Sequence, residues 1–245
     1  MAVLDNLQPY QVFRYFEELS AIPHGSGNTK AISDYCVAFA KEHGLQCWQD
    51  GSNNVVIVKE ASCGYEHAPA IILQGHLDMV CEKTPDCTMD MAAEGLRLAT
   101  DGEYVWAEET TLGGDDGIAI AMALAVLASE DLPHSRVEAV FTTDEEIGLL
   151  GAAALDTSML QGRAMINVDS EVEGILTVSC AGGVRANCHI PVERDVCGGT
   201  LCTVEITGLI GGHSGVEIHK NRANANKVMG EFLSRIQQLM PICIT

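Results

Sequence analysis

Four short motifs between residues 76 and 169 contain side chains that bind metal ions. The first pairs His76 with Asp78 directly after an apolar segment, residues 70–74. Alternation along an extended chain places both side chains on the same side of a strand. A histidine that binds a metal usually needs a carboxylate to orient it, and Asp78 is close enough to do so. A His-x-Asp pair also occurs in ordinary loops, so this motif indicates a site only together with others.

The second motif is a pair of acids, Asp115 and Asp116, with glycines on either side. It directly precedes an apolar segment, residues 118–129, which we expect to form a buried helix. One interpretation is that Asp116 caps this helix, where a negative charge is favourable. That interpretation accounts neither for both acids nor for glycines that let the backbone approach another group closely. A metal ligand is therefore the alternative.

Three consecutive acids, Asp144, Glu145 and Glu146, stand where a predicted strand over residues 137–143 ends. Adjacent carboxylates repel one another unless water or a cation neutralises them, so the alternatives are a solvated turn and a metal site. Neighbouring residues at the end of a strand point in different directions. We therefore expect Glu145 and Glu146 to differ in role, one as a metal ligand and the other as a general base.

The fourth motif contains Asp169, which follows an apolar strand predicted over residues 164–168. A single acid at the end of a strand is common, but metal-binding side chains follow three predicted strands in succession. Histidine together with carboxylates, and no paired cysteines, fits a borderline cation such as zinc, with manganese or cobalt as substitutes. The sequence therefore predicts a metal site at one edge of a sheet.

Helices and strands alternate along the segments that must position these side chains. This order indicates an α/β fold with a mixed, largely parallel sheet covered by helices. In such sheets, ligands bind beyond the carboxyl ends of the strands. Helices are expected over residues 9–21, 28–43 (with Asn28 as N-cap) and 118–129, and strands over residues 45–49, 55–59, 70–74, 137–143 and 164–168.

The pattern changes near residue 185. Alternating apolar residues predict strands over residues 184–190 and 201–207, before a glycine-rich segment and a helix over residues 222–239. Two strands and one helix make a poor core by themselves. We therefore expect one domain over residues 1–185 and the incomplete beginning of an α+β domain over residues 186–245.

Composition argues against several classes of partner. The chain of 245 residues has 14 Lys and Arg against 34 Asp and Glu, a formal net charge of −20. This charge repels nucleic acids and anionic membranes, and no apolar run approaches the ~20 residues of a membrane span. The first residues lack the basic and apolar regions of a signal peptide. The ten cysteines show no Cys-x-x-Cys spacing, so we expect reduced thiols in a cytoplasmic protein.

Five segments of the chain together match the pattern of one protein family. They are residues 76–83 (HLDMVCEK), 111–117 (TLGGDDG), 144–148 (DEEIG), 167–171 (NVDSE) and 211–215 (GGHSG), the last followed by Ile218 and His219. In this order they resemble the aminoacyl-histidine dipeptidases, co-catalytic zinc peptidases related to aminoacylase and carnosinase. The resemblance covers the N-terminal half of the family's pattern. It implies a zinc-exopeptidase-like catalytic domain, followed by the start of a lid domain through which a homodimer forms.

The resemblance also implies roles at the metal site for five residues, four of them as metal ligands. His76 would bind one metal, and Asp78 would orient it. Asp115 would bridge two zinc ions and be joined to the next residue by a cis peptide bond. Glu146 would bind one metal and Asp169 the other.

Catalysis follows from the same resemblance. Glu145 would be the general base that takes a proton from a water between the metals, and His213 would contact the substrate or the developing oxyanion. The implied substrates are small peptides, namely dipeptides of the Xaa-His type. Two alternatives stay open: an N-acyl amino acid deacylase with the same site, and a truncated, non-catalytic fragment that binds metal or dimerises.

Two features depart from the family. Its members usually have Asn after the bridging acid, whereas this chain has Asp116, which adds negative charge beside the metals. The family also has a long second half that supplies a last histidine ligand, and this chain ends at Thr245. We therefore expect one metal to lack a protein ligand in this chain.

Overall fold

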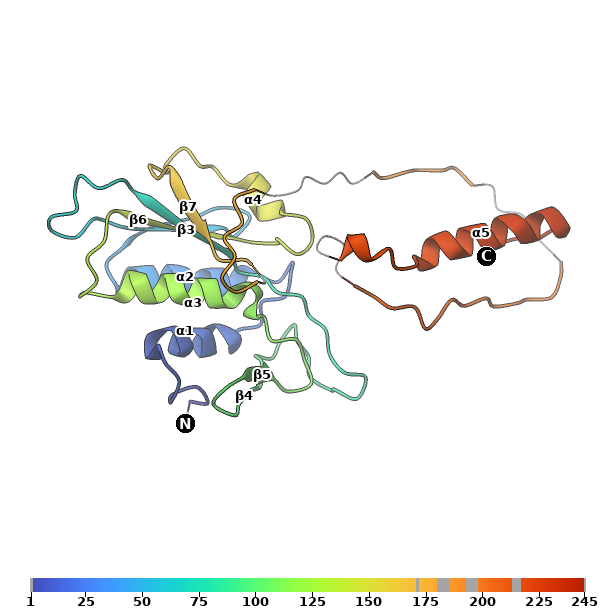
Figure 1. Ribbon diagram of the computed structural model, residues 1–245, viewed down its shortest axis with the longest axis horizontal. Coiled ribbons are helices and arrows are strands. Elements are labelled where there is room, and N and C mark those ends of the chain that lie inside the picture. The colour runs from blue at the N-terminus through green and yellow to red at the C-terminus, as the bar shows by residue number, and fades with distance from the viewer. Residues whose placement is uncertain (1, 171, 180–185, 193–197, 213–216, 245) are drawn as a thin grey trace. The chain divides into compact units, whose positions relative to one another are not determined.

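The computed structural model describes residues 2–170, 172–179, 186–192, 198–212 and 217–244 (Figure 1). The chain forms two units, Met1–Cys180 and Ala181–Thr245. Six of the seven candidate site residues, all except His213, belong to the first unit.

A five-stranded sheet with the order β1-β2-β6-β3-β7 forms the centre of the first unit. Strands β6, β3 and β7 run parallel, whereas β1 and β2 are antiparallel to their neighbours. Because β6 and β3 are parallel and adjacent, their carboxyl ends meet at one edge, with His76 opposite Thr142. The predicted mixed sheet with a parallel core is confirmed. The strands are β1 (Gln46–Gln49), β2 (Val55–Lys59), β3 (Ile71–His76), β6 (Val137–Thr142) and β7 (Ala164–Asn167).

Three helices pack in layers against this sheet (Figure 1). They are α1 (Tyr10–Ser20), α2 (Lys30–Glu42) and α3 (Gly114–Ala128). Helix α2 contacts β1 and β2, α3 contacts β3 and β6, and α1 packs on α3. Because α3 lies between α1 and the sheet, it is apolar on most sides, as its sequence predicted. Phe16 and Leu19 of α1, Leu124 of α3 and Phe141 of β6 are buried in the shared core.

A buried carboxylate in β6 binds the segment of the chain that precedes β7. Glu138 in β6 is fully buried and accepts the backbone N–H groups of Gln161 and Gly162, each at 3.0 Å. Arg136 Nε donates to the same carboxylate at 2.9 Å. Burial by itself would raise the pKa of Glu138, but these donors outweigh it and lower the pKa. The segment that leads into β7 is thereby tied to the neighbouring strand.

Several local predictions were incomplete or wrong. Asn28 is not the N-cap of α2, because Thr29 occupies that position and the Asn28 amide donates to the carbonyl of Ala92 at 3.0 Å. The sequence patterns did not predict the hairpin of three-residue strands, β4 (Leu98–Thr100) and β5 (Val105–Ala107), or the short helix α4 (Leu150–Ala154). Elements of three to five residues show too few periods for a pattern to be recognised.

The second unit contains the short 3-10 helix η1 (Ile218–Lys220) and helix α5 (Ala225–Leu239). The Asn224 side chain caps α5 by accepting the N–H of Lys227 at 3.1 Å. Strands were predicted over residues 184–190 and 201–207. The described residues of these two segments form no strand, so both predictions are wrong there. An alternating pattern forms a strand only where a core receives its apolar face, and Ile190 and Leu201 are exposed.

Seven cysteines in the described part of the chain have free thiols, whereas Cys243 is disulfide-bonded. The expectation of reduced thiols is therefore wrong at Cys243. Within the same described residues, none of the helices is both long and apolar enough to cross a membrane.

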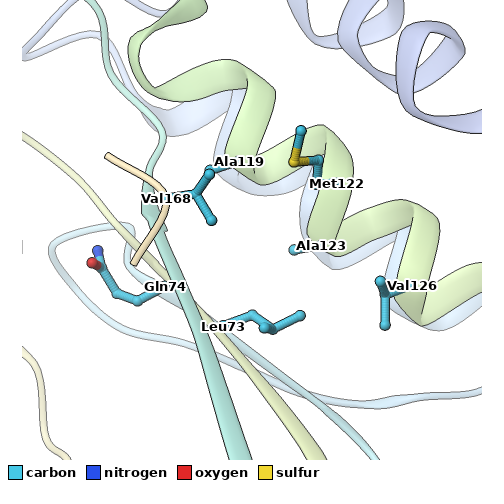
Figure 2. Close-up of a pocket in the computed structure, with 7 residues that line it drawn as sticks. All are labelled: Leu73, Gln74, Ala119, Met122, Ala123, Val126 and Val168. Carbon is cyan, nitrogen blue, oxygen red and sulfur yellow. The ribbon is translucent and has the colours of Figure 1, made fainter. Parts of the chain in front are cut away.

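An apolar pocket of about 130 Å³ lies between β3 and α3 (Figure 2). Among the described residues that line the pocket, Gln74 has the only polar side chain, and its amide donates to Thr142 Oγ1 at 3.2 Å. The described lining residues therefore include no acid, base or nucleophile, so this pocket is not a candidate catalytic site. Its lining consists of Leu73, Gln74, Ala119, Met122, Ala123, Val126 and Val168.

Candidate metal centre

His76 is the last residue of β3 and is buried, with 2% of its surface exposed. Its Nδ1 donates to the backbone carbonyl of Asp78 at 2.9 Å, and its Nε2 lies 2.9 Å from Asp115 Oδ1. Burial lowers the pKa of His76, but the hydrogen bonds to Asp115 and Asp78 outweigh burial and raise the pKa to about 11. The surrounding acids therefore strongly stabilise positive charge at this ring.

The carboxylate of Asp78 holds three different segments. It accepts the hydroxyl of Ser26 at 2.7 Å and the backbone N–H groups of Glu145 and Glu146 at 3.0 and 3.4 Å. Asp78 Oδ1 also lies 3.5 Å from His76 Nδ1. Burial raises the pKa of Asp78, but these partners outweigh it and lower the pKa to about 2. Asp78 is therefore an anion that fixes both the histidine and the acidic turn.

The acid pair at the start of α3 departs from helical geometry. Asp115 and Asp116 have non-helical φ and ψ angles and are joined by a cis peptide bond, as the family resemblance implied. The interpretation of Asp116 as a helix cap is wrong, because Gly113 is the N-cap and no side chain caps the helix. Asp116 Oδ2 instead accepts the backbone N–H of His76 at 3.2 Å. The second acid of the pair thus supports β3.

Asp116 stands where the family resemblance implies an asparagine, and this residue is 1% exposed. Burial raises the pKa of Asp116 to about 7, with the charge of His76 opposing and that of Asp169 adding to the rise. This shift reduces the negative charge that the sequence suggested at position 116. Gly75 makes room for the carboxyl, because a Cβ there would lie 2.6 Å from Asp116 Oδ2.

Three of the four predicted metal ligands lie together. His76, Asp115 and Glu146 each offer a ligand atom, and these atoms all lie within 4.8 Å of one another. This is the one such group of three among the described residues. The fourth, Asp169, follows β7, and its Oδ2 lies 4.0 Å from His76 Nε2. The ends of β3, β6 and β7 and the start of α3 therefore converge on one point.

Glu145 and Glu146 are held beside this point. Burial raises the pKa of each, and the charges of Asp78 and Asp115 contribute to the rise at both. Glu145 is influenced by Asp169 as well, whereas the strongest charge acting on Glu146 is that of Asp115. The charges around the site therefore act on the pKa values of the two neighbours in different order. His213, the predicted substrate contact, lies outside the described residues.

The donor set fits a divalent cation. One imidazole nitrogen and three carboxylates are ligands that suit zinc and are also accepted by manganese. The raised pKa of His76 leads to the same conclusion, because a positive charge is stabilised where a metal would replace the proton. Ser26 and Gly75 support the site but were not predicted, since neither residue type by itself signals a role in a metal centre.

Solved structures of peptidases share this fold. The solved structure of aminoacylhistidine dipeptidase from Vibrio alginolyticus matches this chain with a TM-score of 0.69 and 34% sequence identity. The match covers 94% of this chain and 47% of that chain.

Sequence comparisons then identify particular relatives. The cytosol non-specific dipeptidase of Escherichia coli (strain K12) is 39% identical over 236 residues, which are 96% of this chain and 49% of that protein. Peptidase T of Escherichia coli O9:H4 (strain HS) is 36% identical over 115 residues, which are 46% of this chain and 26% of that protein. No family model matches the chain.

The chain is therefore homologous to the aminoacyl-histidine dipeptidases over nearly its whole length, and the resemblance predicted from its motifs is confirmed. It spans about half the length of the dipeptidases that it matches.

Proposed function

We propose that the protein is a metallopeptidase that hydrolyses dipeptides of the Xaa-His type. In this proposal, His76, Asp115, Glu146 and Asp169 hold two zinc ions, for which manganese or cobalt can substitute. The observation that carries it is the group of ligand atoms of His76, Asp115 and Glu146 within 4.8 Å of one another. Homology to dipeptidases over 96% of the chain supports the reaction class.

Zinc bound at this site would lower the pKa of a water ligand and polarise the peptide carbonyl. Glu145 is the general base in the proposal, and it transfers the water proton to the leaving amine. Its position is supported by the hydrogen bond from its backbone N–H to Asp78. This bond holds the main chain at Glu145, and in the proposal its side chain takes the proton without binding a metal itself.

A cleft beside the metal centre suits a small peptide. It has a volume of about 470 Å³, within the range of roughly 300–1,000 Å³ of small-molecule sites. Glu146 lines the cleft together with apolar side chains that include Met79, Met91 and Ile147. A substrate side chain seated there would lie next to a proposed metal ligand.

The remaining assignments belong to the same proposal. Residues 1–185 form the catalytic domain, and residues 186–245 begin a lid domain through which two copies dimerise. His213 contacts the substrate or the oxyanion. A cytoplasmic location is supported by the name of the Escherichia coli relative, a cytosol dipeptidase.

The test is hydrolysis by the 245-residue protein loaded with zinc, using a panel of Xaa-His dipeptides and a panel of N-acyl amino acids. The proposal predicts release of histidine from the dipeptides, and Glu145→Gln is the control that removes the general base. Faster release from the N-acyl amino acids would instead identify a deacylase. Zinc binding without turnover on either panel would identify a metal-binding or dimerising fragment.

A further inference from the structure

We propose that Asn54 is a positioning residue that locks the turn over residues 143–151, on which Glu145 and Glu146 stand. Its effect on metal binding rests on the proposed function, whereas its effect on the turn does not. Asn54 directly precedes β2 and makes no hydrogen bond to any of the four proposed ligands in the described structure. It acts on them only through the turn.

The turn closes on itself at its two ends. Gly151 N donates to the carbonyl of Thr143 at 2.9 Å, and Leu150 N donates to the carbonyl of Asp144 at 3.1 Å. Asp144 and Leu149 have φ angles of 54° and 60°, a conformation that residues with a side chain rarely adopt. A turn with such strained positions needs contacts outside itself to stay in one conformation.

Asn54 supplies these contacts at both ends of the turn. Its Oδ1 accepts the backbone N–H of Thr143 at 3.1 Å, and its Nδ2 donates to the carbonyl of Gly151 at 2.9 Å. The same Nδ2 donates to Asp50 Oδ2 at 2.7 Å. Since Asn54 is 1% exposed, water cannot replace these bonds.

The site is specific for a side chain that both donates and accepts. Aspartate at position 54 would leave the carbonyl of Gly151 without its donor and would face the carboxylate of Asp50. The fit is also close, because a Cβ on Gly151 would lie 2.4 Å from Asn54 Oδ1 and 2.4 Å from the carbonyl oxygen of Thr143. The Thr143 hydroxyl adds a further bond, to the carbonyl of Ser52 at 2.7 Å.

Asn54 and Asp78 therefore hold the turn at separate places. Asp78 binds the backbone N–H groups of Glu145 and Glu146 in the middle of the turn, and Asn54 binds its ends. With both contacts in place, the two glutamates cannot shift without breaking buried hydrogen bonds. Without Asn54, the strained turn is free to relax and Glu146 loses its fixed distance from His76 and Asp115.

The experiment compares Asn54→Asp with Ser33→Ala in the full 245-residue chain. Ser33 is also fully buried, and its hydroxyl donates to the carbonyl of Asn53 and accepts the side-chain amide of Gln49, each at 2.7 Å. It makes no hydrogen bond to residues 143–151, so its replacement removes two hydrogen bonds from the same neighbourhood and leaves the turn intact. Thr143→Val is a milder variant that keeps the backbone bond and carries the test if Asn54→Asp does not fold.

Amide hydrogen exchange of the metal-free protein is the first measurement. Asn54→Asp should speed exchange over residues 144–150 by about ten-fold or more, Thr143→Val by less, and Ser33→Ala by no more than roughly two-fold. Equal exchange over these residues in the Asn54 and Ser33 variants would overturn the inference. Thermal unfolding of each variant shows whether the two substitutions cost comparable global stability.

Zinc affinity is the second measurement, made with zinc alone. Asn54→Asp should weaken binding about ten-fold, the lower end of the loss seen when a supporting residue of a metal site is removed. Wild-type affinity in this variant, with the turn exchanging faster, would overturn the link from Asn54 to the ligands. A wild-type chain that binds no zinc, with the selective exchange effect present, would contradict the proposed function and uphold Asn54 as the lock of the turn.

Discussion

The carboxylate of Asp78 accepts the backbone N–H of Glu145 at 3.0 Å, across 67 residues of sequence. The backbone carbonyl of Asp78 meanwhile accepts Nδ1–H of His76 at 2.9 Å. One residue therefore sets the orientation of the proposed histidine ligand and the position of the proposed general base. This double contact connects the ends of β3 and β6, the two strands that define the site.

Asp78→Asn should weaken zinc binding by about 10–100-fold, because supporting residues of metal sites have effects of this size. The amide keeps the volume of the side chain, but its NH₂ group would face donors, the hydroxyl of Ser26 or the N–H of Glu145 or Glu146. Competition with a chromophoric chelator measures the affinity. Asp131→Asn changes the charge equally at an exposed position and is the control; equal affinities in the two variants would contradict the prediction.

Glu145→Gln and Glu146→Gln should affect different quantities, the turnover in the first variant and the amount of bound zinc in the second. The first should lower kcat by about 10²–10⁴, the usual contribution of a general base, with bound zinc near the wild-type amount. The second should lose bound zinc, because Glu146 belongs to the ligand group. Turnover and metal content are measured on the same samples. Full turnover in Glu145→Gln would exclude Glu145 as the base.

Gly75→Ala should destabilise the protein by about 1–3 kcal/mol, the cost of inserting a methyl group into a packed core. The new Cβ would lie 2.6 Å from Asp116 Oδ2, 3.1 Å from Ile120 Cδ1 and 3.2 Å from Ala119 Cβ. Chemical denaturation measures the free energy of unfolding. Gly51→Ala is the matched control, since a Cβ at position 51 meets no atom within 4 Å. Equal stabilities would show that β3 shifts without cost.

Glu138→Gln should lower the free energy of unfolding by about 1.5–3 kcal/mol at pH 7, the value of a hydrogen bond to a charged group. The pKa of Glu138 is lowered in the folded protein, so its ionised form contributes stability above its ordinary value of 4.5. This contribution is lost as the pH falls through the lowered pKa. The difference between wild type and variant should therefore be constant from pH 8 to 5 and shrink at lower pH; a difference that grows with acid would be inconsistent with this account.

Much of the first unit could be predicted from sequence because its signals are local. The apolar run that became α3 and the strand-end positions of His76 and Glu146 are visible as patterns of residue type. The convergence of these side chains follows from parallel strands, whose carboxyl ends share one edge of the sheet.

The supporting contacts could not be predicted, because they join segments that are remote in sequence. Ser26 meets Asp78 across 52 residues, and Asn54 meets Gly151 across 97. Asp116 shows the same limit, since its position before an apolar helix suggests a cap and only the folded chain reveals its bond to His76. Serine, asparagine and aspartate all occur at ordinary turns and caps, so their residue type does not distinguish these roles.

Zinc binding by Asp115→Asn tests the central claim most directly. Asp115 Oδ1 lies 2.9 Å from His76 Nε2, and the proposal places Asp115 between both metals. Isothermal titration of the metal-free 245-residue protein with zinc should show binding in the wild type. The variant should bind at least about 100-fold more weakly, since one substitution removes a ligand from each metal. Zinc binding with the same stoichiometry and affinity in Asp115→Asn would contradict the assignment of this cluster as a metal centre.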